Sequence, residues 1–177
     1  MKIFYDVDTQ NDFMLSTGAL YVPDAESIVG KVAVLTNYAQ RKGIPIWGSV
    51  DAHVDNDPEF KIFPPHCIVA TLGQAKVIQA IARKNYFQKQ HYDVFTNPEA
   101  ERALKEKEVT EAVIYGVATD FCVKAAVLGM QARGIQTYVV EDAIRGVFPD
   151  QTKLALEAMT AAGAKFVTTK QVLEDKL

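Results

Sequence analysis

Segments typical of β-strands alternate with segments typical of helices along the chain, and this alternation constrains the fold more than any other feature. Short β-rich runs predict strands at residues 2–8, 44–50, 86–89, 111–117, 136–140 and 165–168. The spacing of apolar residues predicts helices at residues 24–42, 75–83, 99–107, 120–133 and 150–162, the first of them capped by Asp24. Strands that alternate with helices of this length form a parallel sheet, and right-handed crossovers place helices on both of its faces.

The composition predicts a single domain that spans residues 1–177. With 177 residues, of which 49% are hydrophobic, the chain can bury its own core, and no repeat or linker divides it. A net charge of −3, without runs of like charge, argues against nucleic acid or an anionic membrane as partner. Two cysteines are too few for a disulfide framework, and no stretch approaches the roughly 20 apolar residues that span a bilayer. We therefore expect a soluble, cytoplasmic protein.

Polar side chains with reactive chemistry stand at the carboxyl ends of four expected strands. Asp8 ends the first strand, Asp51 and His53 follow the second, Lys89 ends the third, and Cys122 follows the fourth. Ligands of parallel sheets bind beyond these ends, so we expect the five side chains to converge at one edge. No Gly-x-x-x-x-Gly-Lys or Gly-x-Gly-x-x-Gly motif accompanies the first strand, which argues against a nucleotide site.

Cys122 is the candidate nucleophile. It lies where an expected strand passes into an expected helix, and the free N–H groups and positive dipole end of a helix favour the thiolate. Asp8 is placed to act as general base, and Lys89 is a cation that can stabilise the thiolate and orient Asp8. Taken singly, each residue also has a structural interpretation, because a lone cysteine in an apolar helix usually packs in the core.

A second group of residues has the composition of a metal site. Asp51 and His53 are two residues apart, so an extended segment directs both side chains to the same side. His66 follows two prolines, which stiffen the chain that presents it. Two imidazoles and a carboxylate suit Zn²⁺, Fe²⁺ or Mn²⁺, whereas the alternative is that His66 only bonds a backbone group.

Two motifs resemble those of the isochorismatase-like cysteine hydrolases. Residues 8–13, Asp-Thr-Gln-Asn-Asp-Phe, resemble the opening motif of this family, and residues 116–123, Gly-Val-Ala-Thr-Asp-Phe-Cys-Val, resemble its nucleophile segment. The resemblance implies a catalytic triad of Asp8, Lys89 and Cys122. It also implies a cis peptide before Ala118, with the Ala118 and Cys122 N–H groups as the oxyanion hole. The implied fold is a three-layer α/β domain with a six-stranded parallel sheet in the order 3-2-1-4-5-6.

Within this family, the metal residues are similar to those of the nicotinamidases. Asp51, His53 and His66 match the metal ligands of these enzymes, and Glu59, seven residues before His66, resembles a further ligand of some members. The resemblance implies a divalent metal, with zinc first and iron or manganese as alternatives. The implied reaction is hydrolysis of nicotinamide to nicotinic acid and ammonia through a thioester on Cys122.

The resemblance also implies how the substrate ring would be held. Phe13 and Phe63 would supply apolar walls, and Tyr92 lies in a segment similar to one next to the catalytic lysine of some nicotinamidases. Ala52 and Phe63 stand where tryptophan is usual, so the pocket shape departs from the family pattern. Family members often form homo-oligomers. The alternatives are a metal-independent amidase of the same family, acting on a carbamoyl, ureido or lactam substrate, and a catalytically silent scaffold.

Overall fold

The computed structural model describes residues 1–77 and 84–177. These residues form one sheet of six parallel strands in the order β3-β2-β1-β4-β5-β6, as predicted. The strands are β1 (Lys2–Val7), β2 (Ile46–Asp51), β3 (Lys84–Lys89), β4 (Glu111–Val117), β5 (Gln136–Arg145) and β6 (Lys165–Val167). Their order places β1 and β4 at the centre, so the loops that follow these two strands meet near the middle of the sheet edge.

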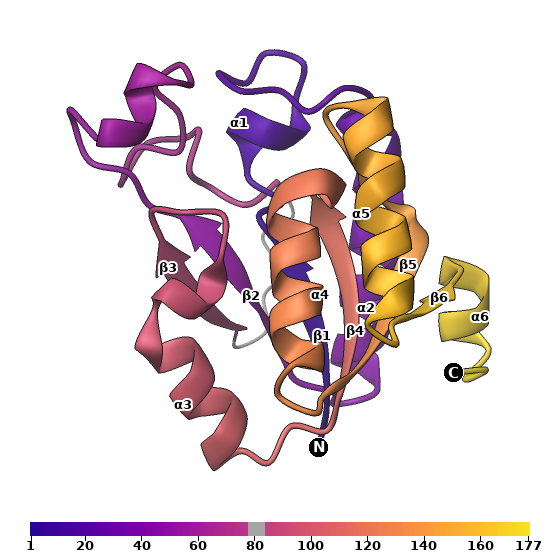
Figure 1. Cartoon of the computed structure of the whole chain (residues 1–177). Helices are drawn as coiled ribbons and strands as arrows, with labels where there is room; N and C mark the ends of the chain where they lie inside the picture. Colours follow the sequence, from indigo (N-terminus) through magenta and orange to yellow (C-terminus); the bar gives the residue numbers. More distant parts are fainter. Residues whose placement is uncertain (78–83) are drawn as a thin grey trace.

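Helices cover both faces of the sheet, which confirms the three-layer architecture (Figure 1). The α-helices are α1 (Asn11–Met14), α2 (Val29–Arg41), α3 (Pro98–Glu106), α4 (Lys124–Gln131), α5 (Pro149–Ala161) and α6 (Thr169–Leu173). Shorter helical turns are η1 (Ala25–Ile28), η2 (Pro58–Lys61), η3 (Val94–Thr96) and η4 (Thr119–Val123). Helices α3, α4 and α5 pack on one face, and α2 and α6 pack on the other.

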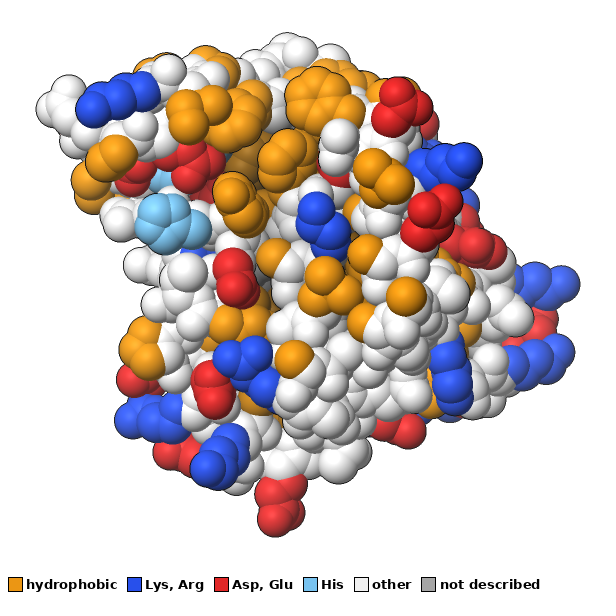
Figure 2. Space-filling model, viewed as in Figure 1, with side chains coloured by type: hydrophobic (Ala, Val, Ile, Leu, Met, Phe, Trp, Pro, Cys, Tyr) orange, Lys and Arg blue, Asp and Glu red, His pale blue; other side chains and the backbone are white. Residues whose placement is uncertain are grey.

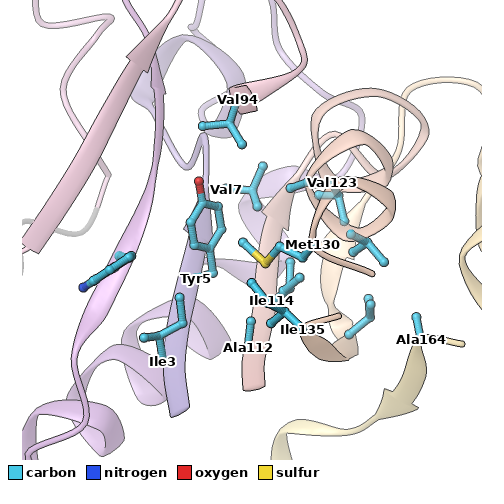
Figure 3. Close-up of a cluster of buried hydrophobic side chains, with 14 of the residues drawn as sticks. Ile3, Tyr5, Val7, Val94, Ala112, Ile114, Val123, Met130, Ile135 and Ala164 are labelled. Carbon is cyan, nitrogen blue, oxygen red and sulfur yellow. The ribbon is translucent and has the colours of Figure 1, made fainter. Parts of the chain in front are cut away.

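Two hydrophobic cores lie between these layers. Side chains of β1 alternate between them, since Ile3, Tyr5 and Val7 belong to the core under α4, whereas Phe4 belongs to the core under α2. Figure 3 shows side chains of the first core, among them Ile3, Tyr5 and Val7 of β1 and Met130 of α4. Because both faces of the strand are covered, apolar residues occupy consecutive positions from Ile3 to Tyr5 instead of alternating with polar ones.

The structure differs from the expected elements at the start of the first helix. Asp24 has a left-handed backbone (φ +60°) and its side chain does not cap the helix that follows. Its carboxylate instead accepts hydrogen bonds from Ser27 Oγ (2.9 Å) and Arg145 Nε (3.0 Å). The helical segment therefore begins with the turn η1, and the α-helix α2 starts only at Val29.

Two further segments depart from expectation. The expected helix 75–83 falls mostly on residues 78–83, which lie outside the described residues, and its beginning is not helical, because Lys76 pairs with Gln10 in an antiparallel bridge. β5 continues to Arg145, beyond the expected end at 140, since a register shift after Ile114 lets the polar residues 141–142 stay within the strand. Helix α6 was not expected, and a capping box at Thr168 begins it.

The sheet brings the ends of its strands together at one edge. Asp51 is paired with Lys89 across β2 and β3, and Val7 is paired with Gly116 across β1 and β4. Asp8 immediately follows Val7, and Val117 immediately follows Gly116. The backbone therefore brings these strand ends together at one edge, as the sequence predicted. None of the helices among residues 1–77 and 84–177 is long and apolar enough to cross a membrane.

Candidate active site

Lys89 lies at the centre of the candidate site and contacts the two other residues of the expected triad. Its Nζ atom is 2.8 Å from Asp8 Oδ2 and 3.5 Å from Cys122 Sγ, and it also forms an ion pair with Asp51. The Lys89 and Asp8 side chains are almost fully buried. Burial alone disfavours the ammonium, yet the surrounding Asp8 and Asp51 carboxylates raise the pKa of Lys89 well above its usual range. Lys89 is therefore a fixed cation next to the sulfur.

Cys122 lies in η4, a single π-type turn that joins β4 to α4. Such turns occur often at functional sites, and this one follows the cis peptide between Val117 and Ala118 that the resemblance implied. The expectation that the helix start favours the thiolate is wrong for this geometry. Burial raises the pKa of Cys122 well above its usual range, and the attraction of Lys89 does not offset it, because the Asp8 carboxylate acts in the same direction as burial.

Asp8 lies on the other side of Lys89, whose ammonium contacts both its carboxylate and the sulfur of Cys122. It follows β1 directly and has a left-handed backbone (φ +45°), a conformation that Asp tolerates better than most residues. The Ser49 carbonyl accepts from its N–H at 3.2 Å, and its own carbonyl accepts from the Gln10 N–H at 2.7 Å. Hence the turn after β1 holds the carboxylate of Asp8 against the ammonium of Lys89.

Asp51, His53 and His66 form the second group, with one ligand atom of each lying within 4.8 Å of the others. Asp51 Oδ2 is 3.8 Å from His53 Nε2 and 3.9 Å from His66 Nε2. All three side chains are buried, and His53 Nε2 has no hydrogen-bond partner among the described residues. Two imidazole nitrogens and a carboxylate oxygen that face one another in this way fit a divalent metal with three protein ligands.

The other nitrogen of each imidazole lies close to a neighbouring oxygen. His66 Nδ1 lies 2.8 Å from the Pro64 carbonyl, and His53 Nδ1 lies 3.0 Å from Asp57 Oδ2. Metal-binding histidines usually donate their second N–H to such a group, which fixes the tautomer and the direction of the ring. Asp57 was not predicted, because its contact with His53 depends on the turn η2 that follows it.

The electrostatic surroundings of this group favour a positive charge. Burial lowers the pKa of His53, but the Asp51 and Asp57 carboxylates outweigh this and raise it to about 9. Burial also opposes the charge of Asp51, yet Lys89 and His53 hold its pKa below the usual range. A cation among these side chains is thus stabilised by carboxylates that stay ionised, which is what a divalent metal site requires.

Two residues of the opening motif, Gln10 and Asp12, bind the two segments of the chain that carry the metal group. Gln10 Nε2 donates to the Asp51 carbonyl at 2.9 Å, and Gln10 Oε1 accepts from the Asp51 N–H at 2.8 Å. Asp12 Oδ2 accepts from the N–H of Cys67, next to His66, at 2.7 Å. Gln10 and Asp12 appeared in the sequence only as marks of the family, since their partners lie more than 40 residues away.

A cavity of about 90 Å³ opens beside Cys122 and the metal group. It is lined by residues from both groups and by apolar side chains, including Phe13, Leu20, Asp51, Glu59, Phe63, His66, Tyr92, Ala118, Phe121, Cys122, Val147 and Phe148. Hydrophobic side chains gather at the corresponding upper end of the molecule (Figure 2). The expected wall residues are thus brought together in one cavity, although Tyr92 is 55% exposed at its rim.

Glu59 stands apart from the metal group. It lines the cavity, but it is not among the residues whose ligand atoms cluster within 4.8 Å of one another. Phe13 and Phe63 are closer to that group, since their rings lie 5.4 Å and 6.5 Å from the ring of His66. The apolar wall and the metal group therefore share His66 as a common boundary.

The chain is similar to known proteins over almost its whole length. Residues 6–171 match the family model described as the isochorismatase domain. The nicotinamidase of Escherichia coli is 29% identical, with 92% of each chain covered, and the nicotinamidase/pyrazinamidase of Mycobacterium tuberculosis is 27% identical, with 94% of this chain and 98% of the relative covered.

The chain is also similar to solved structures over almost its whole length. The crystal structure of a pyrazinamidase of Pyrococcus horikoshii in complex with zinc has a TM-score of 0.89 at 30% identity, and the match covers 94% of this chain and 98% of that one. The fold of the two chains is therefore shared. The chain belongs to the isochorismatase family.

Proposed function

We propose that this protein hydrolyses nicotinamide to nicotinic acid and ammonia, with Cys122 as nucleophile and a divalent metal as cofactor. The observation that carries the proposal is that Lys89 links the two groups, through Asp8 and Cys122 on one side and Asp51 on the other. Cys122, Asp51 and His66 also line one cavity. The nicotinamidase and pyrazinamidase relatives support the same substrate class.

The first half of the reaction forms a thioester. As Cys122 Sγ attacks the carboxamide carbon, a C–S bond forms and the thiol proton passes to Asp8. The ammonium of Lys89 offsets the negative charge on the sulfur and keeps Asp8 in position. The N–H groups of Ala118 and Cys122 would hold the oxyanion of the tetrahedral intermediate. Asp8 then gives the proton to the amide nitrogen, the C–N bond breaks, and ammonia leaves.

The second half releases the product. Asp8, again a carboxylate, takes a proton from a water molecule, and the resulting hydroxide attacks the thioester carbon. The C–S bond breaks, nicotinic acid leaves, and the proton on Asp8 returns to Cys122. Each residue is thereby restored to its starting state, so one thiol and one carboxylate serve both steps.

Asp51, His53 and His66 would hold the metal, with Glu59 as a further candidate ligand. When bound, the ion would supply a Lewis acid for the ring nitrogen of the substrate. The aromatic side chains of Phe13, Phe63 and Tyr92, which line the cavity, would contact the ring. Zinc is the first choice, because the P. horikoshii pyrazinamidase was crystallised in complex with zinc, and the ligand set also suits iron and manganese.

A comparison of substrates tests this function. Ammonia release is measured with nicotinamide and, in parallel, with a carbamoyl, a ureido and a lactam compound. We expect kcat/KM to be highest for nicotinamide, since only its ring nitrogen can use the metal. A higher kcat/KM for one of the other amides, unaffected by chelation, would favour the metal-independent amidase instead.

The contact between Asp57 and His53 gives a separate prediction. Asp57→Ala removes the carboxylate that fixes the His53 ring, and the affinity for zinc should fall by about 10-fold to 100-fold. Competition with a chromogenic chelator measures this affinity without any need for turnover. Asp55→Ala, at an exposed position two residues away, is the matched control and should bind zinc as the unchanged protein does.

We further propose that the protein acts in the cytoplasm as a homo-oligomer and returns nicotinamide to pyridine nucleotide synthesis. Sedimentation analysis of the purified protein tests the oligomeric state. A monomer at all concentrations would contradict that part of the proposal.

A further inference from the structure

Asp120 is a buried carboxylate that the proposed reaction does not use. Only 3% of it is exposed, and both of its oxygens accept hydrogen bonds from the backbone of a distant loop. Oδ1 accepts from the Val147 N–H and Oδ2 accepts from the Phe148 N–H, each at 2.9 Å. A carboxylate that binds two consecutive N–H groups fixes both the position and the direction of that loop.

The loop that Asp120 holds forms part of the cavity wall. Val147 and Phe148 line the cavity together with Cys122. The ring of Phe148 lies 6.3 Å from that of Phe121, which lies 6.1 Å from that of Tyr92. Three loops thus contribute to one aromatic wall, which we call the Phe148 wall.

The Phe148 end of this wall lies at the start of α5. Phe148 is the residue before α5, its side chain does not cap that helix, and it is 51% exposed. The carboxylate of Asp120 accepts from the N–H of this N-cap residue, as the N3 side chain does in a capping box, and its charge lies at the positive end of the α5 dipole. Removal of Asp120 should therefore loosen the start of α5 and let the wall move away from the cavity.

Asp120 also belongs to the same turn as the nucleophile. It precedes Cys122 by two residues within η4, so the turn that carries the sulfur also binds the backbone of Val147 and Phe148. The Asp120 side chain thereby ties the position of this part of the wall to the turn that carries the nucleophile.

We propose that Asp120 is a positioning residue that sets the Phe148 wall and thereby the affinity of the site for the ring of an aromatic carboxamide. This inference rests on the proposed function and adds to it the residue that controls ring binding. It predicts an effect on KM, because the wall contacts the ring in the ground state and in the transition state alike.

Four variants test the proposal, namely Asp120→Asn, Phe148→Ala, the double variant and the control Asp142→Asn. Asp120→Asn should raise KM for nicotinamide on the order of tenfold, the size expected for a lost hydrogen bond to a charged group, and leave kcat within about threefold. The rate of Cys122 alkylation by iodoacetamide should not change. In the Phe148→Ala background, Asp120→Asn should have almost no further effect on KM, since the ring that Asp120 positions is already absent.

Asp142 provides a matched control. Its carboxylate accepts from the Thr169 N–H at 2.8 Å and so holds the start of α6, but it does not line the cavity. Asp142→Asn should lower stability without raising KM. A fall in kcat at unchanged KM for Asp120→Asn, or an effect that is fully additive with Phe148→Ala, would overturn the proposal.

Amide hydrogen exchange separates this proposal from the proposed function. Exchange of the Val147 and Phe148 amides should accelerate in Asp120→Asn whether or not nicotinamide is the substrate, and unchanged protection would overturn the role of Asp120. Failure of the unchanged protein to hydrolyse nicotinamide would overturn the function alone. If Asp120→Asn does not fold, Phe148→Ala still tests the proposal. An unchanged KM in Phe148→Ala would exclude a role of the Phe148 ring in substrate binding and would overturn the proposal.

Discussion

Cys122→Ala is expected to lower the rate of nicotinamide hydrolysis on the order of 10⁴-fold or more, the effect of removing a nucleophile from a catalytic group that acts as a unit. Cys122 is the thiol that both contacts Lys89 and lines the cavity next to Ala118. Substrate binding should remain measurable by calorimetry, because the metal group and the aromatic wall are untouched. Ammonia release at saturating nicotinamide measures the loss.

The second cysteine supplies the control for this experiment. Cys67 is fully buried and does not line the cavity, and burial raises the pKa of its thiol. Cys67→Ala should therefore keep most of the turnover. Substantial turnover by Cys122→Ala would contradict covalent catalysis, because attack by water alone would then account for the rate.

His53→Ala should lose the metal first and the activity as a consequence. The variant removes the ligand whose Nε2 atom faces Asp51 and leaves a carboxylate and one imidazole, which hold a divalent ion far more weakly than three ligands. Elemental analysis after dialysis should find little metal, and turnover should fall on the order of 100-fold or more, as for the loss of a major transition-state contact.

His91 offers a matched histidine for this test. It is exposed and lies outside the metal group, so His91→Ala should keep both metal and turnover. Retention of one metal per chain in His53→Ala would mean that the ion binds elsewhere. Loss of metal with full turnover would separate the metal from catalysis.

Much of the fold followed from local sequence patterns. The end of α2 and the centres of the strands were predicted, because apolar spacing and glycine stops act over a few residues. The extension of β5 was not predicted, since the polar residues 141–142 interrupt its apolar run and only the register shift opposite Ile114 keeps them in the strand. Asp24 looked like a cap by residue type, but its backbone is left-handed and its carboxylate pairs with Arg145, far along the chain.

The sequence predicted the residues of the candidate site but not the contacts that hold them in place. Strand ends and the family resemblance indicated Asp8, Lys89 and Cys122, and the parallel sheet explains why they meet. The pKa of Cys122 was expected in the wrong direction, because the sequence shows the helix start but not the burial of the thiol beside Asp8. The contact of Asp57 with His53 depends on a turn that residue spacing does not specify.

The most direct test is the rate of ammonia release from nicotinamide by the purified protein, measured before chelation, after chelation and after zinc, iron or manganese is added back. Our account predicts that chelation abolishes the activity and that at least one of these metals restores it. Full activity in the chelated protein would contradict the role of Asp51, His53 and His66. No ammonia from metal-loaded protein with reduced Cys122 would contradict the proposed substrate.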